Sequence, residues 1–355
     1  MSRTALFSRD ARRDLAALIH DGRLEDLFLR PATAQERAGP GDLHAAKVES
    51  VAPRLDAAFL DIGGGEGGFL TGGGGLTPGA RILATVQRAA EGDKAARCRL
   101  GADLPGPWLV FTPLTPGINV SRKIEDPAIR KGLQAALASF APEGGFVIRT
   151  EAAGLAPEAL RAEAARLVEE YRVMETAAAS GPPRRLKAGP GLFARALGLW
   201  RGAELLADAG AAAEVPEARL FAGSLMEAWD LDSRLADLTA PQIPLSGGGW
   251  MKIETTLALI AVDVNAGGDR MGVNRAAARE IPRRLRLLGL GGAVAVDFAG
   301  DLGEADRAGL ARVLGSAQDP AWRPLGWGPL GFFEATRRRD RPPLSAALAE
   351  LGGSP

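Results

Sequence analysis

The chain has 355 residues, of which 46% are hydrophobic and 24% are charged, an ordinary composition for a globular protein of two or three domains. Its 43 basic and 43 acidic residues cancel, so overall charge gives no support for a nucleic-acid partner, and any RNA site must come from a local patch. One cysteine excludes an internal disulfide and a cysteine-based zinc site, and the lack of an apolar leader or an 18-residue apolar run predicts a cytoplasmic protein with no membrane partner.

The first 38 residues are predicted to form a strand, a helix and a second strand. The strand patterns cover Thr4–Phe7 and Leu24–Leu29, and the segment between them, Arg9–Ile19, is predicted to be a helix. These elements are too few to close a hydrophobic core alone, so we expect them to pack against a later part of the chain.

From Gly41 the pattern changes to short apolar runs at about ten-residue spacing with Gly- and Pro-rich turns, which is typical of a small β-barrel. Phe59 and Phe69 are the only aromatic residues of this segment. On the outer face of an OB-fold such aromatics stack on bases, whereas from the local sequence alone a place in the core is favoured. Lys94 could reach an RNA phosphate, although a lone lysine in a polar turn is more often simply solvated.

Three glycines of this segment, Gly63, Gly65 and Gly68, match the G-x-G-x-x-G spacing of a dinucleotide site. We reject that interpretation, because the chain continues as FLTGGGG rather than as a helix. No Gly-Lys-Ser/Thr sequence offers a phosphate-binding P-loop either.

Residues 104–175 are predicted to combine strands with a long helix. The strands are Trp108–Pro113 and Phe146–Thr150, and the helix is Glu158–Ala177. The helix carries one apolar face, made of Leu160, Ala164, Leu167 and Tyr171. The stretch NVSRKIE contains Arg122 and Lys123, a small basic cluster and a candidate RNA contact.

The second of these strand patterns ends in Arg149 and Thr150. A guanidinium can bind a phosphate through two parallel hydrogen bonds, and a threonine adds a hydroxyl. The alternative, a surface salt bridge of Arg149, is favoured by the local sequence alone. Residues 178–190, which are basic and rich in Pro and Gly, are predicted to be a linker.

Two apolar runs, LALIAVDVN and GGAVAVDF, end in Asp263 and Asp297 and flank a helical pattern over Asn274–Leu288. Strand, helix and strand in this order predict a βαβ unit with parallel strands. Both aspartates then lie at the carboxyl end of the sheet, where α/β folds place ligands. Pro282 lies inside the helical pattern, where it argues against a regular crossover helix.

Asn265 follows Asp263 by two residues, so it projects to the same side if the strand continues. Two carboxylates and an amide suit a hard cation such as Mg²⁺, which takes few protein ligands and keeps several waters. The alternative is that each aspartate caps the next helix or fixes a turn.

The C-terminal stretch LGFFEATRRRDRPPL contains Arg337, Arg338 and Arg339. Three successive arginines could hold RNA phosphates. A charge run of this kind is more often a solvated face.

Taken in order, these motifs resemble the catalytic region of the ribonuclease E/G family. The resemblance covers nearly the whole chain and is carried by LDAAFLDIGGGEGGFL, SRKIED, the IRT of FVIRT, PLSGGGWMKIETTLALIAVDVNAG, RRLRLLGLGGAVAVDF and GFFEATRRR. The pair VDVN and VDF is the most specific part.

The resemblance implies an α/β fold of several subdomains. These are an RNase H-like subdomain with an inserted OB-fold barrel, a 5′-sensor subdomain and a DNase I-like catalytic subdomain. We expect the RNase H-like subdomain in two parts, residues 1–38 and 184–245. The barrel is then expected at 39–103, the 5′-sensor at 104–183 and the catalytic subdomain at 246–355.

The resemblance also implies roles for single residues. Asp263 and Asp297 would bind Mg²⁺, and Asn265 would be the neighbouring catalytic asparagine. The pair Arg149 and Thr150 would bind the 5′-monophosphate of the substrate. RNA contacts are expected from Phe59, Phe69, Lys94, Arg122, Lys123 and Arg337. The implied activity is cleavage of single-stranded, AU-rich RNA to leave 5′-phosphate and 3′-hydroxyl ends, and DNA is not an expected partner.

The sequence departs from the family pattern in two places. The Cys-Pro-x-Cys zinc-link and the small domain after it are absent, so a zinc-linked tetramer is not expected and the oligomeric state stays open. The loop after Asn265, AGGDRMG, is shorter than in the family. The alternative function is therefore an RNA-binding relative with weak or no cleavage activity.

Overall fold

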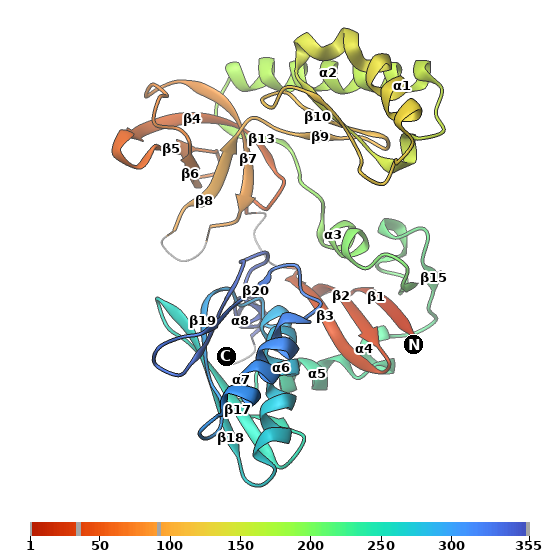
Figure 1. Cartoon of the computed structure of the whole chain (residues 1–355). Coiled ribbons are helices and arrows are strands. Elements are labelled where there is room, and N and C mark those ends of the chain that lie inside the picture. Colours follow the sequence, from red (N-terminus) through yellow and green to blue (C-terminus); the bar gives the residue numbers. More distant parts are fainter. Residues whose placement is uncertain (1, 33–36, 91–93, 353–355) are drawn as a thin grey trace. The chain divides into compact units, whose positions relative to one another are not determined.

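A computed structural model describes residues 2–32, 37–90 and 94–352 (Figure 1). The chain divides into two compact units. One is built from both ends of the chain, Met1–Gln35 and Gly191–Pro355, and the other is the intervening segment Glu36–Pro190. None of the described helices is both long and apolar enough to cross a bilayer.

The first sheet of the first unit has five strands in the order β15-β14-β1-β2-β3. The strands are β1 (Arg3–Arg9), β2 (Arg13–His20), β3 (Arg23–Pro31), β14 (Glu204–Ala207) and β15 (Arg219–Leu220). The predicted helix over residues 9–19 is wrong, because this segment is a turn followed by β2. As the strand next to β1 and β3, β2 buries Leu15 and Ala17 on one face and Ala16 and Leu18 on the other. Burial on both faces produces a continuous apolar run without the alternation that marks a half-exposed strand.

Short helices complete both faces of this sheet. They are α3 (Leu192–Leu199), α4 (Leu225–Ala228) and α5 (Leu231–Leu238), with a 3₁₀ turn at Ala212–Glu214. Phe193 of α3 packs with Phe7, and Leu235 of α5 packs with Leu15. The strand β1 pairs in parallel with β14, so the N-terminal segment is completed by residues some two hundred positions later.

The second unit begins with a closed five-stranded barrel of OB-like form. Its strands are β4 (Leu43–Ala52), β5 (Ala57–Asp61), β6 (Gly67–Thr71), β7 (Arg81–Arg88) and β8 (Ala96–Leu100). They follow the order β4-β5-β6-β8-β7, and β4 pairs with β7 to close the ring. The Gly63–Gly65 segment is the β5–β6 turn, in which these glycines have positive φ. The strand β6 follows it where a dinucleotide site needs a helix, so that interpretation is excluded. In the predicted linker, β13 (Arg184–Lys187) pairs with β4 and extends the barrel sheet beyond the expected boundary at residue 183.

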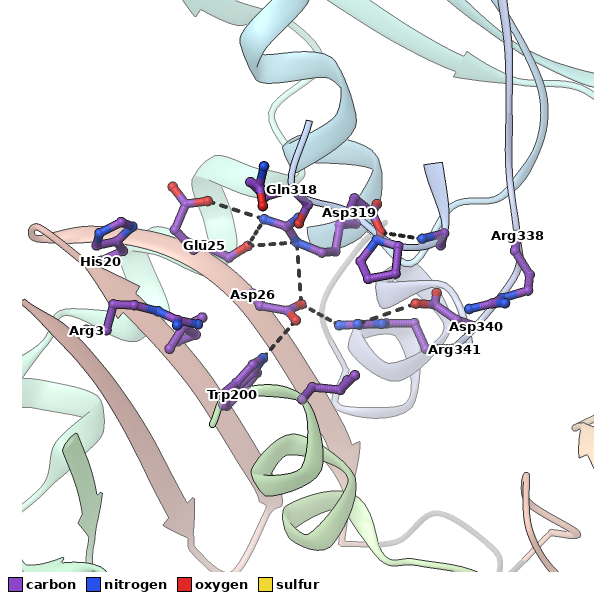
Figure 2. Close-up of a pocket in the computed structure, with 15 residues that line it drawn as sticks. Arg3, His20, Glu25, Asp26, Trp200, Gln318, Asp319, Arg338, Asp340 and Arg341 are labelled. Atoms are coloured by element: carbon purple, nitrogen blue, oxygen red, sulfur yellow. Dashed lines mark hydrogen bonds and ion pairs between the residues drawn. The ribbon is translucent and has the colours of Figure 1, made fainter. Parts of the chain in front are cut away.

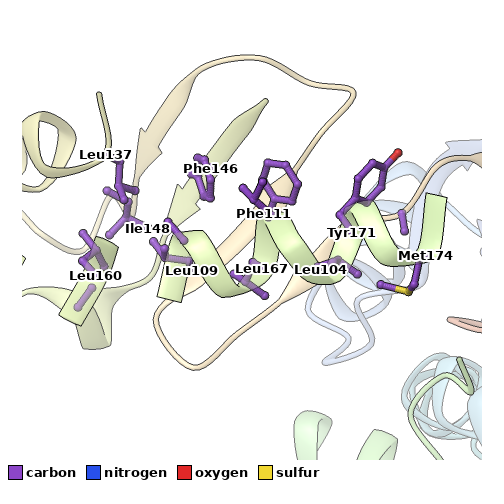
Figure 3. Close-up of a cluster of buried hydrophobic side chains, with 14 of the residues drawn as sticks. Leu104, Leu109, Phe111, Leu137, Phe146, Ile148, Leu160, Leu167, Tyr171 and Met174 are labelled. Atoms are coloured by element: carbon purple, nitrogen blue, oxygen red, sulfur yellow. The ribbon is translucent and has the colours of Figure 1, made fainter. Parts of the chain in front are cut away.

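The rest of the second unit is a four-stranded sheet under two helices. The elements are β9 (Leu104–Pro105), β10 (Leu109–Thr112), β11 (Ile118–Val120), α1 (Pro127–Leu137), β12 (Gly145–Ile148) and α2 (Pro157–Ala179). Figure 3 shows the apolar face of α2, including Leu160, Leu167 and Tyr171, against Phe111 and Phe146 of the sheet. The predicted apolar face of this helix is confirmed, because all four of its residues are buried.

The C-terminal sheet has six strands in the order β16-β17-β18-β19-β21-β20. The strands are β16 (Ile243–Leu245), β17 (Gly249–Thr255), β18 (Leu259–Ala266), β19 (Gly292–Asp297), β20 (Trp322–Trp327) and β21 (Phe333–Arg337). The helices are α6 (Arg270–Leu287), α7 (Glu304–Gly315) and α8 (Leu344–Glu350). The strands β18 and β19 are parallel and joined by α6, as predicted. One face of the sheet packs its Val262, Val264 and Val296 against α6 and α7, while the alternating residues stay open.

The crossover helix α6 continues through Pro282. A proline inside a helix removes one backbone hydrogen bond, at a cost of about 3 kcal/mol. Here the loss is offset by burial, because Ile281 and Leu285 lie in the core and Arg283 pairs with Glu25 and Glu280. Tertiary packing, rather than local propensity, therefore maintains this helix.

Candidate active site and RNA-contacting surfaces

The register of the parallel pair places Asp263 of β18 directly beside Asp297 of β19. Neighbouring strands lie about 4.8 Å apart, and both carboxylates are exposed on the open face of the sheet. Neither aspartate caps a helix, because α6 is capped by Asp269 and α7 starts after Gly303. The helix-cap alternative is therefore wrong. Neither carboxylate accepts a bond from a turn within the described residues either, because Asp263 accepts only from the Asn265 side chain and Asp297 accepts none.

Asn265 lies on the same strand as Asp263 and turns toward it. Its Nδ2 donates to Oδ2 of Asp263 over 2.6 Å. This bond fixes the carboxylate and leaves the amide oxygen of Asn265 able to accept a further hydrogen bond. The expectation that both side chains project to one side is confirmed.

The donor set of this site consists of oxygen atoms alone. Within the described ranges no three His, Cys, Asp or Glu side chains group as metal ligands, so the site offers two carboxylates and an amide. Such a site fits Mg²⁺, which is bound through one or two carboxylates and retains waters, better than it fits zinc.

A cation that the sequence analysis missed completes the row. Lys252 of β17 is the register partner of Asp263, so Lys252, Asp263 and Asp297 follow one another across three strands. Its ammonium lies 2.6 Å from Glu254, which is the main cause of a raised lysine pKa, and the charge of Asp263 adds to it. The alternation of WMKIET could have indicated an outward lysine, but only the strand register reveals its neighbour.

The pair Arg149 and Thr150 follows β12, and Ser121 follows β11. These two strands are parallel and in register, so the two turns meet. Ser121 Oγ and Thr150 Oγ1 are 2.8 Å apart, and the Ser121 amide donates to Ile148. Sequence reasoning missed Ser121, whose place depends on this pairing.

The guanidinium of Arg149 is half-buried and makes no hydrogen bond or ion pair with any other residue that the structure describes. The salt-bridge alternative for Arg149 is therefore wrong. Arg122 and Lys123 are exposed beside Ser121. Arg130 of α1 shapes their turn by donating to the carbonyls of Ser121 and Ile124. Free cations and two hydroxyls thus meet at one edge of the sheet, where they suit a phosphate.

Arg149→Lys is expected to keep activity on RNA with a 5′-hydroxyl but to lose most of any preference for a 5′-monophosphate. Lysine retains the charge, but it lacks the planar fork that binds two phosphate oxygens. The measurement is the ratio of cleavage rates on the two 5′ ends. The matched control is Arg161→Lys, on the exposed side of α2. An unchanged ratio in Arg149→Lys would show that this residue does not sense the 5′ end.

Phe59 and Phe69 are register partners on the outer face of the barrel. Their ring centroids are 5.5 Å apart, and Phe59 is 42% exposed. The alternative that both belong to the core is wrong, because the core is formed by their neighbours Ala58, Leu60 and Leu70.

On the next strand, β8, Arg97 is the register partner of Phe69. On β7, Arg88 is the register partner of Arg97. Neither arginine makes an ion pair with another described residue. Lys94 is exposed before β8, but it is Arg97 that the register places beside the aromatic pair. Aromatic rings flanked by free guanidiniums are suited to unpaired bases and their phosphates.

Phe59→Ala is expected to weaken binding of single-stranded RNA by about 1–3 kcal/mol, the usual loss of one base–aromatic stack. Because the ring is outside the core, thermal stability should change little. Binding is measured by fluorescence anisotropy beside a melting curve, with Leu55→Ala as an exposed apolar control. A large fall in melting temperature without a separate binding defect would instead assign the ring a structural role.

The predicted RNA contact at Arg337 is wrong. Its side chain is 0% exposed, and Nε donates to Asp319 Oδ2 over 2.8 Å. A second nitrogen donates to the Leu290 carbonyl and pairs with Asp340. Within the run of three arginines, Arg339 donates to the Gly291 carbonyl, and Arg338 is exposed. Side chains alternate between the two faces at the end of β21, so Arg337 is buried although the sequence of three arginines suggests a fully solvated surface.

The model of the ribonuclease E/G family matches residues 103–205 and 206–340. Ribonuclease E of Nostoc sp. is 27% identical over 332 residues, which cover 80% of this chain and 48% of the relative. Ribonuclease G of Salmonella typhimurium is 28% identical over 391 residues, which cover 94% of this chain and 79% of the relative. Ribonuclease E of Haemophilus influenzae is 29% identical over 334 residues, which cover 79% of this chain and 35% of the relative. The chain spans about half the length of the Nostoc relative. Because the family match extends over well more than half of the 355 residues, the chain belongs to the ribonuclease E/G family.

Proposed function

We propose that the chain is a Mg²⁺-dependent endoribonuclease that cuts single-stranded RNA and leaves 5′-phosphate and 3′-hydroxyl ends. The observation that carries the proposal is the row of Asp263 and Asp297 on the open face of the sheet, with Asn265 bonded to the first. Membership of a family whose curated relatives are named ribonucleases E and G supports it.

In this proposal each sheet of the fold corresponds to one subdomain of the family. The five-stranded sheet with its helices corresponds in this proposal to the RNase H-like subdomain, and the six-stranded sheet to the DNase I-like catalytic subdomain. The barrel is the OB-fold RNA-binding element, and the four-stranded sheet with its two helices is the 5′-sensor. The protein is proposed to act in the cytoplasm on RNA processing or decay.

In the catalytic step Asp263 and Asp297 would hold the ion. When bound, Mg²⁺ lowers the pKa of a water and offsets the charge that develops on the phosphate. Asn265 holds the carboxylate of Asp263 in place and offers its amide oxygen to orient the attacking water. Lys252, next in the row, adds a positive charge for the phosphate backbone.

Substrate binding is proposed to use the two surfaces of the second unit. Phe59 and Phe69 stack on unpaired bases, with Arg97 beside them. Arg149, Thr150 and Ser121 bind the terminal phosphate. Stacking requires unpaired bases and the phosphate site requires a 5′ end, so the proposal predicts a preference for single-stranded RNA.

The deciding experiment follows cleavage of a 5′-monophosphorylated, AU-rich oligonucleotide as Mg²⁺ is titrated, and then maps the ends of the products. Mg²⁺-dependent internal cleavage with 5′-phosphate ends supports the proposal. Tight binding with no cleavage at any Mg²⁺ concentration would overturn it in favour of an RNA-binding relative. The short Gly267-Gly268 connection that follows β18 is the departure from the family pattern that makes an RNA-binding relative without cleavage the alternative, and this experiment separates the two functions.

The 355-residue chain is expected to bind no stoichiometric zinc and to form no zinc-linked tetramer. Its one cysteine, Cys98, is fully buried in the barrel, and burial raises the pKa of the thiol to about 11. A buried neutral thiol cannot serve as an intersubunit thiolate ligand. Elemental analysis and light scattering with and without a chelator provide the check. A tetramer that a chelator dissociates would contradict this expectation.

A further inference from the structure

A cavity of about 440 Å³ lies in the first unit, apart from the catalytic row (Figure 2). It is lined by β1–β3, by the end of α3, by α6 and by two C-terminal segments, residues 318–321 and 338–341. None of Asp263, Asn265 and Asp297 reaches it. Its volume is within the range of small-molecule sites, which is about 300–1,000 Å³.

The carboxylates around this cavity are all occupied by protein groups. Asp26 accepts from the Trp200 indole over 2.9 Å and from Arg341 over 2.6 Å. The other carboxylate pairings are Glu25 with Arg283 and Arg286, Asp319 with Arg337, and Asp340 with Arg337 and Arg341. The negative charge of the lining is thus already neutralised within the protein.

Two arginines of the lining have no such partner. Neither Arg3 nor Arg338 makes a side-chain hydrogen bond or ion pair with any residue that the structure describes. Arg3 is the register partner of His20, which also lines the cavity. In Figure 2 the labelled Arg3 and Arg338 lie on opposite sides of the central Asp26. The surplus charge is therefore positive and is divided between two ends.

The lining also has an apolar part. It is formed by Leu18, Leu199, Trp200, Pro320 and Ala321. Leu199 is exposed although it is large and apolar. Gln318 adds a side-chain amide, whose nitrogen donates to the Ser316 carbonyl and whose oxygen can accept a bond from a ligand. An apolar wall with one amide suits a flat heterocycle with polar edges.

We propose that this cavity binds a nucleotide with phosphate on both its 5′ and 3′ sides. The base lies against the apolar wall, and Arg3 and Arg338 each bind one phosphate through the planar guanidinium. The same chemistry is presented by a free nucleoside 3′,5′-bisphosphate and by one nucleotide within an RNA strand. The site is distinct from the proposed nuclease centre, so it adds a second nucleotide-binding position to the first unit.

The test measures binding of adenosine 3′,5′-bisphosphate to the full chain by calorimetry, in EDTA so that no cleavage occurs. The variants are Arg3→Gln and Arg338→Gln, and the control is Arg279→Gln, an exposed arginine on α6 that does not line the cavity. Each cavity variant is expected to bind about ten- to a hundredfold more weakly, as loss of a charge-assisted bond predicts. The control should bind as the wild type does. All three should fold normally, because the replaced side chains are exposed.

A second set of measurements shows which arginine binds the 3′-phosphate and whether the ligand is a free nucleotide or part of an RNA strand. Adenosine 5′-monophosphate should bind more weakly than the bisphosphate in the wild type, and one of the two cavity variants should abolish that difference. Displacement of the bisphosphate by an uncleavable 2′-O-methyl RNA identifies the RNA strand as the source, and lack of displacement identifies the free nucleotide. Absence of bisphosphate binding to the wild type, or equal affinity in all variants, would overturn the proposal. Neither result bears on Mg²⁺-dependent cleavage, which is measured separately.

Discussion

Asp297→Asn is expected to reduce Mg²⁺-dependent RNA cleavage at least about a hundredfold, because loss of a metal carboxylate removes several kcal/mol of transition-state stabilisation. Stability is expected to stay the same or to rise by about 0.2–1 kcal/mol. The register places Asp297 beside Asp263, and like charges directly opposite on a sheet are destabilising. A fall in activity together with a rise in stability is the result expected when a residue is kept for function at a cost in stability.

The measurement pairs single-turnover cleavage with thermal unfolding, and RNA binding is followed in EDTA. Asp263→Asn should behave in the same way, although its amide would now face the Nδ2 of Asn265. The matched control is Glu217→Gln, an exposed carboxylate of the same unit that makes no ion pair within the described ranges. Cleavage at the wild-type rate in either aspartate variant would remove the metal-site proposal, whatever happens to the melting temperature.

The βαβ unit formed by β18, α6 and β19 was predictable from local sequence. The two apolar runs have the length of strands, and each ends in an aspartate. A continuous apolar run is typical of a strand buried on both faces, whereas here helices cover only one face and the alternating residues stay open. The same reasoning is wrong at β2, where Leu15–Ile19 is equally apolar but the pattern predicts a helix over residues 9–19. The apolar runs of β2 and of β18 look alike in a short stretch of sequence. They differ in the fold, because β2 is covered on both faces of its sheet and β18 on one.

Residues that act through a cross-strand neighbour could not be found in the sequence. Lys252, Ser121 and Arg97 each lie beside a predicted site residue only because of strand register. Register is set by the whole hydrophobic pattern of a sheet, and a shift of one residue would turn each side chain to the other face. Motif spacing therefore finds one member of a cross-strand pair and misses the other.

Arg337→Met is expected to destabilise the first unit by about 3–5 kcal/mol, because removal of one partner from a buried ion pair leaves the other charge uncompensated. The carboxylate side chain of Asp319 is only 2% exposed, and its second oxygen is occupied by the Ala321 amide. For a unit of this size the melting temperature should fall by about 10 °C. The neighbouring Arg338→Met, which changes an exposed side chain, should stay within about 0.5 kcal/mol of the wild type.

The double variant Arg337→Met with Asp319→Asn separates the pair from simple loss of packing. If the cost comes from the uncompensated carboxylate, the double variant should be more stable than the sum of the two single changes predicts. Purely additive losses would instead assign the effect to the packing of the arginine side chain. A variant that melts like the wild type yet binds RNA more weakly would restore Arg337 as a phosphate contact and contradict the burial of its side chain at the end of β21.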